Sequence, residues 1–221
     1  MGLLRNFASR LNDEQSYDID NEIAEASLIT IENLIRKCPN EAKIKISEIY
    51  QLSSLGLIYD PNYQYNEDED DDQDQDMDDT EDKWGDSDFD DINDDDDDDT
   101  AWKVRKGAIK LIDAIIVTCP MQLKEFWFKY LDLLQKRFME RDDNVKCEIL
   151  ETFQTLIKSS LKPDDEHFGE YQSQKVSQFE DQINQIYPSI IKNLLKQFKS
   201  KNIKVKVATM KTISVLSMVL P

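Results

Sequence analysis

The sequence contains few of the residues from which catalytic sites, metal sites and disulfide frameworks are built. Its 221 residues include one histidine, three cysteines, five glycines and six prolines. The single histidine, His167, has no nucleophile or second base at a fixed spacing. The cysteines (Cys38, Cys119 and Cys147) lack metal-ligand spacing, and their odd number favours a reducing compartment. No glycine-rich phosphate loop is present. We therefore expect a non-enzymatic protein without a cofactor, a bound metal or a small-molecule substrate.

Long apolar runs are also missing. The longest uncharged stretches, 49–59 and 212–221, reach only about half of a membrane span, so no transmembrane helix is expected. The first eleven residues carry Arg5 and Arg10 but lack the apolar core and cleavage site of a secretory signal. We interpret them as the first helix of the fold, with a mitochondrial presequence as the alternative. The expected location is the cytoplasm and nucleus.

The negative charge of the chain is concentrated in one segment. Residues 66–99 contain 22 of the 46 acidic residues and one of the 27 basic residues, so this segment carries a charge of −21 and the rest of the chain about +2. The run Asp94–Asp99 cannot pack, because each carboxylate would lose its hydration beside another negative charge. A disordered acidic insert is therefore predicted over 60–100. A basic helix follows at once, and Thr100 is predicted to cap it with its side chain.

Helices of one pattern recur through the rest of the chain. Four of them begin at Ile23, Val104, Val145 and Val205, with apolar residues at helical spacing, and Cys-Pro ends the first two. A first helix precedes each one, and Val104 and Val145 are 41 residues apart. Two helices in about 40 residues are typical of HEAT and armadillo repeats. The first helices are expected at 2–12, 41–58, 121–138 and 181–198.

The predicted fold class is therefore all-α, a HEAT-repeat α-solenoid with an armadillo-like superhelix of about four helix pairs. The second helix of each pair is expected to line the concave face. Arg105, Lys146 and Lys206 are interpreted as hydrogen-bonding to acidic turn residues of neighbouring repeats, with a direct partner contact as the alternative. Cys38 and Cys119 are interpreted as packing residues. The predicted divisions are 1–59 (repeat one and the first helix of repeat two), 60–100 (acidic insert), 101–160 (the rest of repeat two and repeat three), 161–180 (polar loop) and 181–221 (repeat four).

Two groups of residues are candidates for partner binding. A basic face could hold an acidic partner or the acidic insert itself, and its candidate lysines are Lys103, Lys106, Lys110, Lys204 and Lys211. Within the acidic insert, Trp84 and Phe89 could form a linear binding motif. Ser87 is a candidate phosphorylation site because acidic residues follow it. Solvation of a helix face is the alternative explanation for most of the lysines.

Two motifs on either side of the acidic insert resemble one known family. Tyr59-Asp60-Pro61-Asn62-Tyr63 precedes the acids, and Trp102-Lys103-Val104-Arg105-Lys106 follows them. Together they resemble the cullin-associated, neddylation-dissociated proteins, and the match continues through most of 17–221, as an internal part of the N-terminal third of that family. The resemblance implies a HEAT superhelix that is not an enzyme. It also implies that a cullin and its RING subunit are the partners, and that assembly and substrate-receptor exchange of the cullin–RING ligase are regulated.

Two other functions stay open at this point. HEAT-repeat nuclear transport receptors also carry acidic loops, so the chain could be a fragment of one of them. The insert could instead act as an acidic chaperone for basic proteins, with the repeats only holding it. Neither nucleic acid nor a membrane is expected as a partner. Because apolar helices stand at both ends of the sequence, we expect a piece of a longer superhelix or a truncated version of one.

Overall fold

The computed structural model describes residues 21–60, 100–160 and 184–218, and these residues form helices joined by turns, without a strand among them. The expected helix at 2–12, most of the acidic insert with Trp84, Ser87 and Phe89, and nearly all of the polar loop lie outside the described residues. None of the described helices is both long and apolar enough to cross a membrane. The helices are α2 (Asn21–Lys37), α3 (Pro39–Lys43), α4 (Ile46–Ile58), α5 (Ala101–Thr118), α6 (Pro120–Lys136), α7 (Asp143–Ser160), a helix over 184–197, and α9 (Ile203–Leu216).

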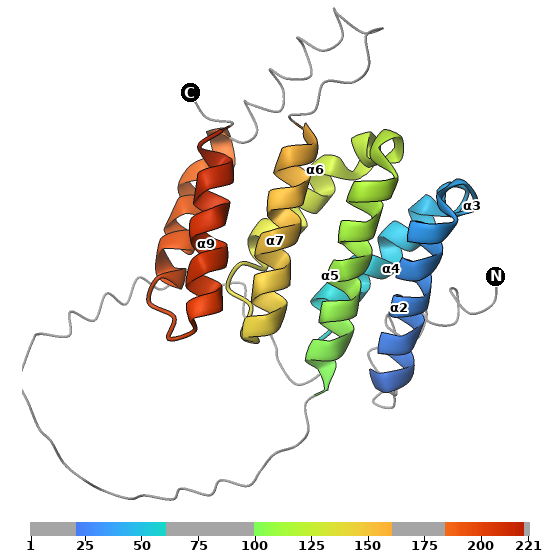
Figure 1. The fold of residues 1–221 in the computed structure, drawn as a ribbon, viewed down its shortest axis with the longest axis horizontal. Coiled ribbons are helices and arrows are strands. Elements are labelled where there is room, and N and C mark those ends of the chain that lie inside the picture. The colour runs from blue at the N-terminus through green and yellow to red at the C-terminus, as the bar shows by residue number, and fades with distance from the viewer. Residues whose placement is uncertain (1–20, 61–99, 161–183, 219–221) are drawn as a thin grey trace, which may run out of the picture.

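The helices form two layers (Figure 1). Helices α2, α5, α7 and α9 stand side by side in one layer, and α4, α6 and the helix over 184–197 lie behind them. Within the first layer, each helix packs on the following first-layer helix: α2 packs on α5, α5 on α7 and α7 on α9. This stacking of helix pairs confirms the predicted all-α class and is the arrangement of an α-solenoid.

Two Cys-Pro pairs mark where the chain turns from one layer to the other. Pro39 and Pro120 are the first residues of α3 and α6, and the cysteines before them have non-helical backbone angles. Proline disfavours the helical conformation of the preceding residue but suits the first position of a helix. Cys119 is buried as predicted, whereas Cys38 is exposed. The prediction for Cys38 is wrong because α2 has a first-layer neighbour on one side only among the described helices.

Two other local predictions are wrong. The helix expected at 41–58 is divided by a turn at Ile44 and Lys45, where backbone N–H groups bond three residues back, to Glu41 O and Ala42 O. Such bonds tighten and end a helix. Thr100 does not cap α5 with its side chain. Its hydroxyl instead accepts a hydrogen bond of 2.8 Å from Asn21 Nδ2 and links the start of α5 to the start of α2.

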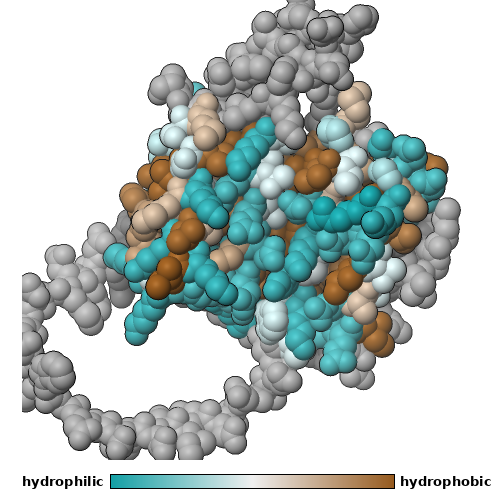
Figure 2. Space-filling view, in the orientation of Figure 1, coloured by the Kyte–Doolittle hydropathy of each residue, from teal (hydrophilic) through white to brown (hydrophobic). Residues whose placement is uncertain are grey.

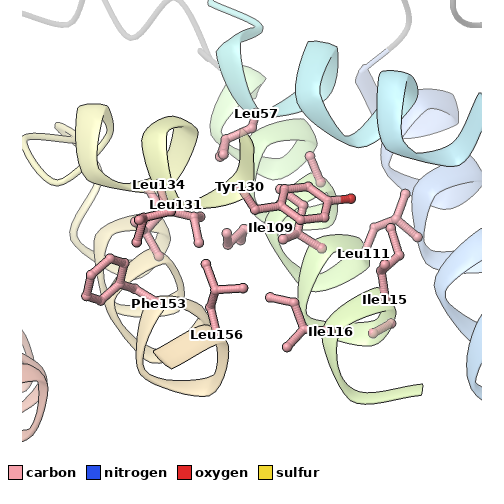
Figure 3. Packing of buried hydrophobic residues seen from close by; sticks show 14 of the residues in the cluster. Leu57, Ile109, Leu111, Ile115, Ile116, Tyr130, Leu131, Leu134, Phe153 and Leu156 are labelled. Atoms are coloured by element: carbon pink, nitrogen blue, oxygen red, sulfur yellow. The ribbon is translucent and has the colours of Figure 1, made fainter. Parts of the chain in front are cut away.

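The core lies where the two layers meet. Figure 3 shows side chains from α4, α5, α6 and α7 converging there, among them Leu57, Ile109 and Leu134. Tyr130 reaches into this core from α6, and its hydroxyl lies 3.3 Å from Ser53 Oγ on α4. Burial raises the pKa of Tyr130, and the Ser53 contact only partly opposes that shift. The phenol therefore stays neutral and satisfies its polar atom within the core.

Two glycines lie where helices of this core approach closely. A Cβ atom on Gly56 of α4 would lie 2.9 Å from Ala108 Cβ on α5, and one on Gly107 would lie 3.2 Å from Leu28 Cβ on α2. The first distance is shorter than van der Waals contact and involves no flexible side chain. Helices α4 and α5 therefore cannot keep their separation if Gly56 gains a side chain.

We expect Gly56→Ala to lower the free energy of unfolding by about 1 to 2 kcal/mol, although alanine is the better helix former. Urea unfolding measures this loss. In an Ala108→Gly background the same substitution should cost less, because the clashing methyl group is gone. Gln51→Ala, at an exposed position of α4, is the matched control and should change stability by less than about 0.5 kcal/mol. Equal effects of Gly56→Ala in both backgrounds would contradict the close approach of Gly56 to Ala108.

Candidate interaction face

A cluster of charges, buried except for the exposed Arg141, joins the start of α5 to the turn before α7. The Arg105 side chain is 1 % exposed, and its guanidinium lies 3.1 Å from Glu140 Oε1 and 3.4 Å from Asp60 Oδ2. Glu140 Oε2 lies 2.8 Å from Arg137 Nη2, and Asp60 Oδ1 lies 2.7 Å from Arg141 Nη2. Buried charges are tolerated when they are paired in this way. We call these five residues the charge clasp.

The charge clasp joins the two parts of the chain that flank residues 61–99. Asp60 stands just before residues 61–99 and Arg105 shortly after them, and Arg105 Nη1 also donates to Tyr59 O at 3.2 Å. Glu140 Oε1 further accepts the backbone N–H groups of Arg141 and Asp142, which orders the turn. The predicted hydrogen bond from Arg105 to an acidic turn residue is therefore confirmed.

The corresponding prediction for Lys146 is wrong, because its ammonium pairs with Asp143 of its own helix at 3.2 Å. The link to the next repeat at this place is made by Asp143 itself. Its Oδ2 accepts from Asn202 Nδ2 at 3.0 Å, and the side chain of Asn202 caps α9 by accepting from Lys204 N. The neutral side chain of Asn202 thus links the start of α9 to α7. One repeat earlier, the charged side chain of Arg105 links α5 to the turn before α7.

The three candidate lysines of α5 lie on one stripe of that helix. Lys103, Lys106 and Lys110 are partly exposed, while Val104 and Arg105 point inward. Positions three and four residues apart share one face of a helix. Lys106 Nζ also lies 5.8 Å from the centre of the Trp102 ring, a cation–π contact that holds this lysine along the helix.

The other helices of the first layer carry charge of alternating sign on the same face. Helix α7 presents Glu148 and Glu151 between the lysines of α5 and those of α9. Burial raises the pKa of Glu148, and Lys110 and Lys106 oppose the shift, which places these two lysines beside it. Helix α2 is acidic through Glu22, Glu25 and Glu32, and its Arg36 lies 3.0 Å from Asp113 Oδ2 of α5. Figure 2 shows that hydrophilic residues cover most of this face.

A shallow groove separates α7 from α9 on this face. Gln154 lies in it and donates to Thr212 Oγ1 at 3.0 Å. The groove opens to solvent and is lined by both charge signs, with Glu151 and Lys158 on α7 and Lys211 on α9. Its remaining lining residues are Thr155, Ser214, Val215 and Met218.

Two findings bear on chemistry at this face. Burial raises the pKa of the nearby Cys147 thiol, and Glu151 adds to the shift, so Cys147 is a poor nucleophile. In the described part of the chain, no three His, Cys, Asp or Glu residues are grouped so that they could hold a metal ion.

The structure brings the five candidate lysines to one face but not to one patch. Lys103, Lys106 and Lys110 are neighbours on α5, whereas Lys204 and Lys211 stand on α9, with α7 between them. The sequence predictions missed the acidic stripe of α7. Aligning the repeats would have found it, because Lys110, Glu151 and Lys211 occupy the same position in successive second helices. We call the exposed face of α2, α5, α7 and α9 the striped face.

Several proteins are similar to the chain over most of its length. Cullin-associated NEDD8-dissociated protein 1 of Dictyostelium discoideum is 29% identical over 222 residues, 95% of this chain and 16% of the relative. The protein of the same name in Drosophila melanogaster is 30% identical over 187 residues, 85% of this chain and 15% of the relative. Cullin-associated NEDD8-dissociated protein 2 of Mus musculus is 30% identical over 205 residues, with 91% and 16% covered. The chain thus spans 15–16% of the length of these relatives. No family model matches it.

We expect Arg105→Met to lower the free energy of unfolding by about 2 to 4 kcal/mol, because Glu140 and Asp60 would stay buried with fewer cations around them. Chemical denaturation measures the loss. Lys103→Met removes a cation from the same helix at the surface and serves as the control, with an expected change below about 0.5 kcal/mol. If the two variants are equally stable, the charge clasp does not hold the array together.

Proposed function

Since the chain is a relative of the cullin-associated NEDD8-dissociated proteins along most of its length, we propose that it is a non-enzymatic scaffold for cullin–RING ubiquitin ligase cores. In this proposal it binds the cullin and its RING subunit and regulates the assembly of the ligase and the exchange of its substrate receptors, in the cytoplasm and nucleus. The names of the relatives favour this function over a transport receptor or an acidic chaperone.

The striped face is the observation that carries the proposal for this chain. It runs across four parallel helices, and its residues come from every repeat that the structure describes. An extended face of this kind suits a partner that is bound through many modest contacts. Lys103, Lys106 and Lys110 lie three and four residues apart on α5 and are the proposed centre of the contact.

The alternating charges of the striped face limit the charge pattern that a partner surface can have. A uniformly acidic surface laid on α5 and α9 would also meet Glu148 and Glu151 of α7, and like charges brought together disfavour binding. The fitting partner therefore offers acidic groups to α5 and α9 and basic groups to α7. Helices packed side by side can present charges at this spacing, because neighbouring helix axes lie about 8–10 Å apart.

We expect the triple variant Lys103→Glu, Lys106→Glu, Lys110→Glu to bind an unmodified cullin–RING core about 10- to 100-fold more weakly, since three favourable contacts become repulsive. Isothermal titration calorimetry measures the affinity, and circular dichroism checks that the helices persist. The control reverses three exposed lysines away from the striped face, Lys136, Lys196 and Lys199, and should bind as the wild type does. If the triple variant binds the cullin–RING core as tightly as the wild type does, the contact does not lie on α5.

The double variant Glu148→Lys, Glu151→Lys distinguishes a partner with alternating charges (a striped partner) from a uniformly acidic one. A striped partner should be bound about tenfold more weakly by this variant, because its basic groups would meet the new lysines. A simply acidic partner would be bound more tightly. The same calorimetric titration, repeated at higher salt to screen the charges, gives the sign of the change. Tighter binding would contradict the proposed match of charge pattern.

A further inference from the structure

The turn between the helix over 184–197 and α9 carries charge of one sign. Lys196, Lys199 and Lys201 stand at this turn, and all three side chains are exposed. The sequence from 182 to 221 contains seven lysines and no acidic residue. Among the residues that the structure describes, no carboxylate pairs with any of these three ammonium groups. We call Lys196, Lys199 and Lys201 the lysine turn.

The exposure of the lysine turn belongs to its position in the repeat. Lys136, Met139 and Arg141 occupy the same three positions in the preceding repeat. All three are exposed there, although helices of other repeats pack on both sides of that repeat. Lys136 pairs with Asp132 at 3.1 Å, and Arg141 pairs with Asp60 at 2.7 Å. The preceding turn thus has acidic partners for its cations.

The last repeat has lost these acidic partners. The three acidic residues of the preceding turn, at 140, 142 and 143, correspond to Ser200, Asn202 and Ile203. The position of Asp132, which pairs with Lys136, is taken by Lys192. Lys196 therefore has a like charge four residues before it on the same helix, which is unfavourable until a counter-charge is added. A surface of this kind fits an acidic occupant.

The acidic insert is attached at the same end of the array as the lysine turn. Contacts of Arg105 with Glu140 and of Asp143 with Asn202 place the starts of α5, α7 and α9 along one end (Figure 1). Neighbouring helix axes lie about 8–10 Å apart, so the lysine turn lies about 20 Å from the start of α5. The six residues of Asp94–Asp99 directly precede α5. An extended run of this length covers about 20 Å.

The lysine turn suits this segment better than the lysines of α5 do. Lys106 and Lys110 lie beside Glu148 of α7, so acidic residues placed there would also meet like charge. At the lysine turn, the described residues offer cations alone. Residues 66–99 carry a charge of −21 on the same chain, and this covalent link raises their effective concentration at the turn.

We propose that residues 66–99 dock on the lysine turn of their own chain, with Asp94–Asp99 nearest to it. The contact consists of surface ion pairs that are individually weak, so their number and the covalent tether together hold it. It lies at the end of the array and leaves the striped face exposed, so it does not rest on the proposed cullin contact.

Titration of the full chain with a synthetic peptide of residues 66–99 tests the proposal. In a neutral-insert variant, every Asp of 66–99 becomes Asn and every Glu becomes Gln, at unchanged chain length. This variant should bind the peptide. The wild type should bind it at least about tenfold more weakly, because its own acidic residues already occupy the lysine turn. Isothermal titration calorimetry measures both affinities, and circular dichroism checks that the helices persist.

Two charge reversals in the neutral-insert background locate the site. Lys196→Glu, Lys199→Glu, Lys201→Glu should lower the peptide affinity by at least about tenfold. The matched control Lys103→Glu, Lys106→Glu, Lys110→Glu makes the same change of charge on the striped face. It should lower the affinity by less than about threefold at physiological salt, where distant charges are screened. This control is also the variant expected to lose cullin binding, so the two proposals fail in different titrations.

Three results of these titrations would overturn the proposal. A neutral-insert variant that does not bind the peptide would show that the lysine turn is no acidic-segment site. Equal losses in the two reversal variants would show that the peptide responds to net charge alone. A wild type that binds the peptide as tightly as the neutral-insert variant does would assign the turn to a different acidic partner.

Cross-linking of the wild type identifies the chain that supplies the acidic residues. A zero-length carbodiimide reagent joins a carboxylate to an ammonium group that it contacts. At low protein concentration, peptide mass spectrometry should find links between the lysine turn and residues 66–99 within the monomer. Links found only in cross-linked dimers would assign the occupant to a second copy, and the absence of links would equally contradict the proposal.

Discussion

The burial of the Arg105 charge is the constraint on which the array depends. A guanidinium with 1 % exposure must find its counter-charges inside the protein, and Arg105 finds them in Asp60 and Glu140. Asp60 follows α4 and Glu140 precedes α7, so the Arg105 side chain of α5 links the end of α4 in repeat two to the turn between α6 and α7 in repeat three. The chain between 61 and 99 thus leaves and re-enters the array at one fixed place. A long insertion is compatible with the fold because its ends are held together.

The apolar core follows the same repeating logic. A single helix pair cannot bury both sides of its second helix, so each pair completes the interface of the one before it. Val104 and Val145 are completely buried on one side of α5 and α7, and Ile109 and Leu150 on the other. Gly56 and Gly107 then set how closely the layers and neighbouring helices approach.

Much of this fold could be predicted from the sequence because its signals are local. Helical spacing of apolar residues and the Cys-Pro pairs identify the helices and their pairing without knowledge of the tertiary structure. The predictions failed where a residue far away in the sequence determines the local structure. Thr100 bonds to Asn21, 79 residues away, instead of capping its own helix. The exposure of Cys38 depends on its place at the edge of the array, which one repeat alone cannot reveal.

The candidate face shows why a list of basic residues does not define a binding surface. Charge alone makes Lys110 and Lys211 candidates, yet Glu151 stands at the same repeat position between them. Neighbouring helices of opposite sign attract each other, so the alternation also favours the lateral packing of the array. A partner that binds across the striped face must match this order of charges and not only their sum. Specificity of the proposed cullin contact therefore resides in the sequence of stripes, which the repeat itself determines.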